Sequence, residues 1–557
     1  MTQKIAPGRV PARAVKSLSF AEIPGQSRLF LDYLKDPASL KSFYPNTAAS
    51  PLQSAAFRDT LLRSYVTSRS SLCNALREIN KAGGAPDATL RNVELLQERD
   101  TVAIVTGQQA GLFSGPLYTI YKAMSAIRLA DHLCNSGVNA VPVFWVASED
   151  HDIEEIDHVE VLRRNGELSR QTYRPLNFTE GASVGDIQFD GRVEQAVDEL
   201  MLALPQTEFS GEVRQILATS YANGDAYGTS FTKLILALLG NYGLVVIDPL
   251  HAGIKKLASR MYVAAIERSE DIVTAIRQRN ADLDAAGYTP QVLVEADYFP
   301  LFWHDESGRR LALRHTGDSM FRVKGEKRQL HRNELLQLAQ NDPQRLSPGV
   351  MLRPIVQDYL LPTLCYFGGG AEIAYFAQNS AAYQVLDRPV TPVFHRQSFT
   401  VVEPRERRNL GHFGWDLKAL FKGKDAALMD AAERELASDL ARLFADVEGQ
   451  VNGELNRLDQ RLSRTDPTIA ASLANRRKKI LYHIKTLRDK ALLSEVYKNE
   501  TMRRRIDDIF NALLPHGVLQ ERELNMVTFL NNYGPGIIDW IYDAGDLNDR
   551  GHRILEI

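Results

Sequence analysis

Two polar clusters in the first half of the chain have the residue types needed for chemistry. The first, GQQAGLFSGP over residues 107–116, combines three glycines with the adjacent amides Gln108 and Gln109. The second, SEDHD over residues 148–152, places three carboxylates beside an imidazole. A glycine loop lets backbone N–H groups approach an anion, and carboxylates can accept a proton, hold an ammonium group or bind Mg²⁺. Together the clusters predict a site for a polar ligand.

The second cluster contains most of the predicted catalytic residues. Asp150, His151 and Asp152 are expected to carry the acid–base chemistry, and Glu149 is expected to contact the substrate. A zinc site is not predicted, because no second histidine or cysteine stands at ligand spacing. The alternative interpretation is an ordinary solvated exit from a strand.

The glycine loop precedes an amphipathic segment, 116–133, that contains the fourth predicted catalytic residue, Lys122. Helical spacing places Tyr118 and Lys122 on one face, where the lysine is expected to reach a phosphate at the start of the helix. The loop is neither GxGxxG nor a Walker loop, so it predicts neither dinucleotide nor P-loop chemistry. A tight turn followed by a solvated lysine is the alternative. The predicted ligand-contacting residues of this segment are Gly107, Gln108, Gln109, Gly111, Ser114, Gly115 and Tyr118.

A second group of candidates lies between residues 353 and 372. Arg353 is expected either to clamp a carboxylate or phosphate, or to form a structural ion pair. Three consecutive glycines, 368–370, indicate unusual backbone angles or a close approach, and Glu372 also suits a helix start electrostatically. The predicted ligand-contacting residues here are Arg353, Gln357, Asp358, Gly368, Gly369, Gly370 and Glu372.

The elements that must position these residues follow an α/β pattern. Short β-branched runs alternate with amphipathic segments, which predicts βαβ units in a parallel sheet. The predicted strands are 102–105, 141–147, 243–248, 363–367 and 390–394. Ligands bind at the carboxyl ends of the strands in such sheets. We therefore expect the polar clusters to lie along one edge of a Rossmann-like core.

Two β-rich inserts are expected to interrupt this core. Asn165-Gly166 stands between two alternating runs and predicts a hairpin, within an insert of about 158–225. Alternation over 291–325 predicts a second insert, within about 288–345. The core, with a helical N-terminal lead-in and both inserts, is expected to occupy residues 1–420.

The C-terminal part has a different pattern. From 425 to 462 apolar residues recur at intervals of four and three, which is typical of a coiled coil. After a turn at 466–467, a second helix is expected to run to about Leu514. The first helix is acidic and the second basic, which favours antiparallel packing. The expected domain is an antiparallel coiled coil over 421–515, and the remaining segment, 516–557, is expected to pack back on the core.

Composition narrows the class of protein. The chain has 557 residues, 44% of them apolar and 24% charged, which is typical of a globular protein with two or three domains. A net charge of -3 gives no reason to expect nucleic acid or a membrane as partner. No secretory signal or spanning segment is expected. The three scattered cysteines form no disulfide framework, so a reducing cytoplasm is predicted.

Three segments of the chain resemble the BshC family, the cysteine-adding enzymes of bacillithiol biosynthesis. They are TGQQAGLFSGPLYTIYKA at 106–123, PVFWVASEDHD at 142–152 and RPIVQDYLLPTLCYFGGGAEIAYFAQ at 353–378. The resemblance extends over nearly the whole length. It implies a Rossmann-like core with connecting inserts, an antiparallel coiled-coil domain and a homodimer formed through that domain.

The resemblance also implies an activity, the joining of cysteine to glucosaminyl-malate in the last step of the pathway. Activation of the cysteine carboxylate points to ATP as co-substrate, with Mg²⁺ as its accompanying ion. The fold is related by analogy to class I nucleotidyl-transfer enzymes, yet this chain has no HIGH-type histidine pair and no KMSKS loop. The alternatives are a nucleotidyl- or glycosyl-transferase, or a non-catalytic coiled-coil scaffold. A scaffold has no need of polar strand ends.

Overall fold

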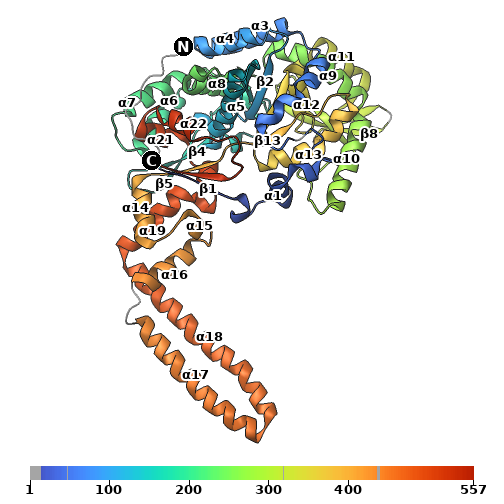
Figure 1. The fold of residues 1–557 in the computed structure, drawn as a ribbon. Helices are drawn as coiled ribbons and strands as arrows, with labels where there is room; N and C mark the ends of the chain where they lie inside the picture. The colour runs from blue at the N-terminus through green and yellow to red at the C-terminus, as the bar shows by residue number, and fades with distance from the viewer. Residues whose placement is uncertain (1–13, 47, 318, 436–439) are drawn as a thin grey trace.

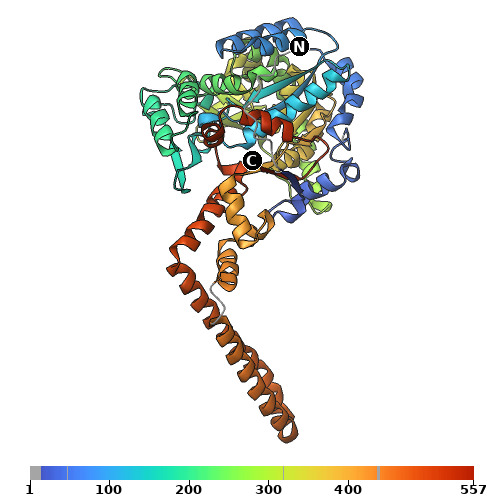
Figure 2. The same ribbon diagram turned by 60° about the vertical axis from the view of Figure 1, so that its left-hand side comes forward.

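A computed structural model describes residues 14–46, 48–317, 319–435 and 440–557 (Figure 1). It shows a core of sheets and helices from which one long pair of helices projects, and the second view confirms this arrangement (Figure 2). The core holds the N-terminal two thirds of the chain and also the C-terminal segment.

A five-stranded parallel sheet forms the centre of the core, in the order β13-β12-β2-β3-β6. Its strands are β2 (Val102–Gln108), β3 (Ala140–Val146), β6 (Val245–Ile247), β12 (Thr363–Gly368) and β13 (Val393–His395). Every predicted strand is present, and the predicted fold class is confirmed. The strands are apolar nearly throughout because both faces of the sheet are covered.

Alternate side chains of β2 enter two separate hydrophobic cores. Val102 and Ile104 pack with Leu129 and with Phe57, so the helix that follows β2 and the N-terminal lead-in share one face. Ala103 and the other alternate residues belong to the larger core. Fully burying a valine or isoleucine side chain, such as that of Val102 or Ile104, stabilises a fold by about 1.5–3 kcal/mol.

Helices connect the strands and surround the sheet (Figure 1). They are α1 (Arg28–Lys35), α2 (Arg58–Ser64), α3 (Arg69–Ala82), α4 (Asp87–Leu95), α5 (Tyr118–Asn135), α8 (Tyr227–Leu239), α9 (Ala252–Glu267), α10 (Ser269–Ala285), α12 (Arg353–Leu360) and α13 (Gly370–Val385). Strands β3 and β6, which follow β2 in the chain, lie on one side of β2 in the sheet. The later strands β12 and β13 lie on its other side. This reversal of strand order lies between β2 and β12, where open α/β sheets form a crevice.

The two inserts lie beside this sheet. The first contains the predicted hairpin, β4 (His158–Leu162) and β5 (Leu168–Thr172), whose turn places Gly166 at φ +84°. Helices α6 (Arg192–Ala203) and α7 (Ser210–Ser220) follow it. The second insert is a sheet of order β10-β9-β8-β7-β11 with antiparallel pairing. Its elements are β7 (Tyr298–His304), β8 (Arg310–Gly317), β9 (Met320–Val323), β10 (Gln329–His331), α11 (Arg332–Asn341) and β11 (Leu346–Pro348).

A third sheet joins segments from both ends of the chain. β15 (His552–Glu556) lies between β1 (Ala14–Leu18) and β14 (Phe399–Val402). The C-terminal segment that leads to β15 contains α20 (Gln520–Glu523), α21 (Met526–Tyr533) and α22 (Ile537–Ala544). This segment therefore lies against the core.

The projecting pair of helices is the antiparallel coiled coil of α17 (Leu440–Thr465) and α18 (Pro467–Lys498). At its base lie α14 (Pro404–Phe413), α15 (Leu417–Leu420), α16 (Lys424–Glu435) and α19 (Glu500–Leu513). An ion pair of 3.2 Å between Arg488 and Glu433 joins the basic to the acidic segment. The predicted first helix, from 425 to 462, includes residues 436–439, which lie outside the described residues.

The second helix is shorter than predicted. It was expected to run to about Leu514, but α18 ends at Lys498 because Asn499 has ψ 87°. The Asn499 side chain accepts a hydrogen bond of 3.1 Å from the Met502 amide and caps α19. Asparagine is among the preferred N-cap residues. Apolar residues at helical spacing resume directly after the break, at Met502, Ile506 and Ile509, so the pattern predicts helix on both sides of Asn499.

Across the described ranges, no helix is both long enough and apolar enough to cross a membrane.

Candidate functional site

A buried ion pair stands at the carboxyl ends of β2 and β12. Lys122, in the second turn of α5, lies 2.5 Å from Glu372, in the first turn of α13. The Lys122 ammonium also donates hydrogen bonds to the Gly107 carbonyl, at 3.0 Å, and to Gln108 Oε1, at 2.9 Å. The structure therefore brings four of the predicted site residues together across the crevice.

The Glu372 carboxylate balances the positive charge of Lys122 inside the protein. Burial lowers the pKa of Lys122. Burial opposes ionisation of Glu372, but Lys122 and the Gly369 amide outweigh it and hold the pKa of Glu372 below its ordinary value. Lys122 was predicted to meet a phosphate, but in this structure its charge is already matched by Glu372.

The triple-glycine turn has a packing explanation. A Cβ on Gly368 would lie 2.8 Å from the Glu372 side chain, and one on Gly370 would lie 3.3 Å from the Phe30 ring. Glu372 accepts hydrogen bonds from the Gly369 amide, at 2.7 Å, and from the Tyr366 hydroxyl, at 2.6 Å. The small residues let Glu372 fold back over the turn toward Lys122.

Arg353, at the start of α12, lies on the same side of the crevice as Glu372. Among the described residues its hydrogen-bonding partners are all neutral. It donates to Gln357 Oε1, at 2.9 Å, and to the Tyr375 hydroxyl, at 3.2 Å. Asp358 does not pair with it. That carboxyl is buried, receives hydrogen bonds from Gln357 and Tyr383, and has a pKa raised by burial. The structural ion pair considered for Arg353 is therefore not formed with Asp358.

The backbone of the loop that follows β2 forms hydrogen bonds within the loop and with other parts of the protein. The amide of Gly111 donates to Gln109, and the amide of Gly115 donates to Leu112. The carbonyls of Phe113 and Gly115 accept from the Asn525 side chain at 2.7 and 2.6 Å. The Ser114 hydroxyl is buried nearby. These contacts give the loop a packing role.

The SEDHD cluster divides between two directions. Glu149 forms a buried ion pair with Lys255 of α9, away from the crevice. Asp152 accepts a hydrogen bond of 3.1 Å from the Glu154 amide and so caps a short turn. Asp150 accepts a hydrogen bond of 2.9 Å from Gln109. Of the four predicted residues, Asp150 is therefore the one that binds the loop after β2, whereas the His151 ring lies against Phe302 of the second insert.

The second insert orients Asp150 and His151. Arg310 of β8 lies 3.1 Å from His151 Nδ1 and 3.6 Å from Asp150. Burial acts to raise the pKa of Asp150, but hydrogen bonds from His151 and Gln109 outweigh it and hold the pKa well below its usual range.

A buried ion pair that the sequence did not suggest lies beside Tyr118 and the cluster of residues around Lys122. Arg396, directly after β13, donates to both carboxylate oxygens of Glu521, at 2.8 and 2.9 Å. Burial acts to raise the pKa of Glu521, but Arg396 lowers it to about 2. The guanidinium carbon lies 5.4 Å from the centre of the Tyr118 ring, and Gln108 donates to the Tyr118 hydroxyl at 3.2 Å. This pair therefore adjoins the Lys122 cluster.

Arg396 could have been predicted, because it ends a strand as SEDHD does. Glu521 could not, because it comes from the C-terminal segment. Lys255 and Arg310 come from a helix and from an insert strand, and no local pattern marks either residue.

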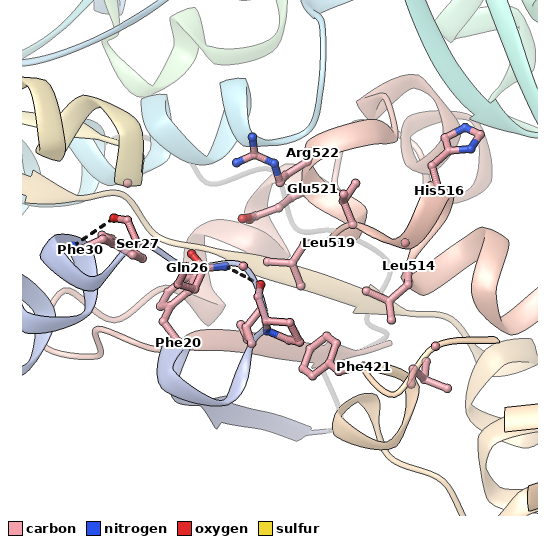
Figure 3. Close-up of a pocket in the computed structure, with 18 of the residues that line it drawn as sticks. Phe20, Gln26, Ser27, Phe30, Phe421, Leu514, His516, Leu519, Glu521 and Arg522 are labelled. Atoms are coloured by element: carbon pink, nitrogen blue, oxygen red, sulfur yellow. Dashed lines mark hydrogen bonds between the residues drawn. The ribbon is translucent and has the colours of Figure 1, made fainter. Parts of the chain in front are cut away.

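A cavity of about 940 Å³ opens next to Arg396 and Glu521. Its walls come from the N-terminal segment, from the starts and ends of core elements at Gly370 and His395, and from the base of the coiled coil. Figure 3 shows Phe20 and Phe421 on one side of the cavity and Arg522 on the opposite side. Of the predicted ligand-contacting residues, Gly370 is the one that lines it.

The described residues hold no group of three or more histidine, cysteine, aspartate or glutamate side chains arranged to bind a metal ion.

The fold and this site define a class of protein. It has a Rossmann-like core with buried ion pairs at the carboxyl edge of the sheet, and its C-terminal domain is a coiled coil whose base reaches that edge. Family models match both parts. Residues 14–397 match "Bacillithiol biosynthesis BshC, N-terminal Rossmann-like domain", and residues 399–557 match "Bacillithiol biosynthesis BshC, C-terminal coiled-coil domain".

The chain belongs to the BshC family. A relative from Koribacter versatilis is 33% identical over 97% of this chain and 99% of its own length. Relatives from Salinibacter ruber and Geobacillus kaustophilus are 31% and 30% identical, over 95% and 96% of this chain and 96% and 98% of their own lengths. All three carry the name "Putative cysteine ligase BshC". The resemblance seen in three sequence segments is thereby confirmed over nearly the whole chain.

Proposed function

We propose that this protein is a ligase that joins the carboxyl group of cysteine to the amine of glucosaminyl-malate, the last step of bacillithiol biosynthesis. One observation supports this most. The chain matches both BshC domains end to end, and its buried polar residues gather where an α/β sheet binds ligands. The name of its relatives supplies the reaction type.

Amide formation requires an activated carboxyl group, and we propose ATP as its source. A carboxylate oxygen of cysteine would attack the γ-phosphorus of ATP and expel ADP, giving an acyl-phosphate, or attack the α-phosphorus and expel pyrophosphate, giving an acyl-adenylate. The amine nitrogen would then attack the acyl carbon, and the phosphate or AMP would leave with the bonding electron pair. Mg²⁺ would enter with ATP as its counter-ion.

The residues at the crevice suit different roles in this reaction. Arg353 is the cation suited to a phosphate, because its partners, Gln357 and Tyr375, are neutral. Lys122 is already paired with Glu372, so we assign it to holding the edge of the site in place. Asp150 lies beside the loop that follows β2, where Gln109 binds it, and we assign this carboxylate to accept the proton that the amine must lose.

Reconstitution tests the reaction directly. Purified protein is incubated with cysteine, glucosaminyl-malate and ATP, and the product thiol and the nucleotide are quantified. The proposal expects one equivalent of ADP or AMP per amide formed, and no product when ATP is omitted. Product formed at the same rate without ATP would remove ATP from the reaction. No product under any condition, together with normal thiol levels in a deletion strain, would refute the ligase.

We also propose a homodimer formed through the coiled coil. Two helices alone leave apolar side chains of the seam uncovered, with Leu443 59% and Leu487 61% exposed. Val447, Leu458, Ile469 and Ile480 are exposed as well. A second copy would remove this apolar surface from water. Cys134 is free and exposed, which supports the reducing cytoplasm as the compartment.

A further inference from the structure

The cavity beside the carboxyl edge is shared between the two domains of the family. Its core side includes Gly370, at the start of α13, and Arg396, after β13. Its other side comes from the base of the coiled coil and the segment after it, including Leu519 and Arg522. A ligand in this cavity would therefore contact both domains at once.

Most cations near the cavity already have an anionic partner. Lys122 pairs with Glu372, and Arg396 is held by both oxygens of Glu521. Pairs this well buried and hydrogen-bonded are costly to break. A ligand anion would therefore need a different cation.

Arg522 is a cation without such a partner. Across the part of the chain that the structure describes, its side chain makes no hydrogen bond and no ion pair, and it is exposed. It follows Glu521 directly, so the buried Arg396–Glu521 pair fixes its backbone beside the cavity. Its charge acts on Tyr118, whose hydroxyl binds Gln108 of the Lys122 cluster. In Figure 3 its guanidinium lies across the cavity from Phe20 and Phe421.

The opposite wall suits the rest of a polar organic ligand. Phe20 and Phe421 give apolar contact surfaces, and Gln26 and Ser27 add neutral polar groups. The His395 imidazole, at the end of β13, also lines the cavity, and burial lowers its pKa to about 3, so it is a neutral group. Among the described residues that line the cavity, Glu521 is the one carboxylate, and Arg396 pairs with both of its oxygens.

We propose that Arg522 binds an oxyanion of a substrate, a carboxylate or a phosphate, in this cavity, so that the C-terminal domain completes the active site of the core. The inference rests on the proposed ligation for its list of substrates. Glucosaminyl-malate carries two malate carboxylates, cysteine carries one carboxylate, and ATP carries phosphates. Arginine recognises both kinds of oxyanion with paired hydrogen bonds.

The test replaces Arg522 and measures each substrate separately. Arg522→Gln removes the charge, Arg522→Lys keeps it without the fork of donors, and Arg503→Gln is the matched control. Arg503 is an exposed arginine on α19 that does not line the cavity. Apparent KM values are measured for glucosaminyl-malate, ATP and cysteine, and thermal unfolding confirms that each variant is folded.

The expected result is a rise of about 10- to 100-fold in the KM of one substrate for Arg522→Gln, a smaller rise for Arg522→Lys and no change for Arg503→Gln. A rise for glucosaminyl-malate or cysteine identifies a carboxylate, and a rise for ATP identifies a phosphate. Unchanged KM values for all three substrates in folded Arg522→Gln would overturn the inference.

A binding measurement separates this outcome from failure of the proposed reaction. Calorimetric titration of wild type and Arg522→Gln with glucosaminyl-malate, ATP and cysteine, one at a time, needs no turnover. Weaker binding of one compound by Arg522→Gln supports the site even if no amide is formed. Equal binding by both proteins, or no binding of any compound by wild type, refutes it.

Discussion

At the scale of single residues, the ion pair between Lys122 and Glu372 links the stability of the site to its chemistry. Lys122→Met leaves the buried Glu372 carboxylate without a cation, so we expect a loss of about 3 kcal/mol in the free energy of unfolding, together with loss of ligation. Denaturant titration and the amide-forming assay measure the two effects. The double variant Lys122→Met/Glu372→Gln should recover stability but stay inactive. Activity in that variant would contradict a role for the pair in the reaction.

Asp150 and Asp152 were predicted to act alike, but their contacts distinguish them. Asp150 is held ionised by three partners, whereas Asp152 caps a turn. We expect Asp150→Asn to lower kcat by about 100-fold or more. Asp152→Asn should remain near wild type, because asparagine can make the same cap. Steady-state kinetics decides between them, and equal losses in both variants would restore the original prediction for Asp152.

Glu406 of α14 should make stability depend on pH. Burial, and then the nearby Glu403, raise the pKa of its buried carboxyl from 4.5 to about 7. Between these values the folded protein keeps a proton that the unfolded chain loses, so stability falls as pH rises, by about 3 kcal/mol in all. Thermal unfolding at pH 5 and at pH 7.5 should show a smaller difference for Glu406→Gln than for wild type. An identical pH dependence in both proteins would show that Glu406 titrates normally.

At the scale of elements, the coiled coil tests the proposed dimer. Leu487→Asp places a charge in the exposed apolar seam of α18, so we expect it to weaken self-association without unfolding the core. Leu202→Asp is the control, because Leu202 is 84% exposed on α6, away from the coiled coil. Sedimentation velocity gives the oligomeric state of each protein. A dimer that persists in Leu487→Asp with an unchanged dissociation constant would argue against this interface.

Elements were predictable where burial acts through a short stretch of chain. Strand β3 is apolar throughout because both sheet faces are covered, and the turn at Gly166 required an unusual φ that Asn-Gly supplies. The end of α18 was missed for the converse reason. Helical apolar spacing resumes at Met502 and Ile506, and the break at Asn499 depends on one capping hydrogen bond that leaves no periodic signal.

At the scale of the whole molecule, the coiled-coil tip and the active site are separable. The tip projects away from the core (Figure 2), whereas Leu492 and Val496 are buried at the base of α18. Replacing residues 453–476 with a short glycine-serine turn should preserve kcat/KM per chain within about twofold and reduce dimerisation. Kinetics and light scattering measure both properties. Loss of activity in a folded, shortened protein would mean that the site needs the tip or a second copy.

The sequence by itself determined the class of fold, the polar edge of the sheet and the coiled coil, because each leaves a periodic or strand-end pattern within a short window. Only the tertiary structure decided which charges meet. Lys122 finds Glu372 across the strand-order reversal, Glu149 turns to Lys255, and Arg396 is held by Glu521, 125 positions away. Such partners depend on topology, so no local pattern predicts them. The same topology leaves Arg522 unpaired beside the cavity.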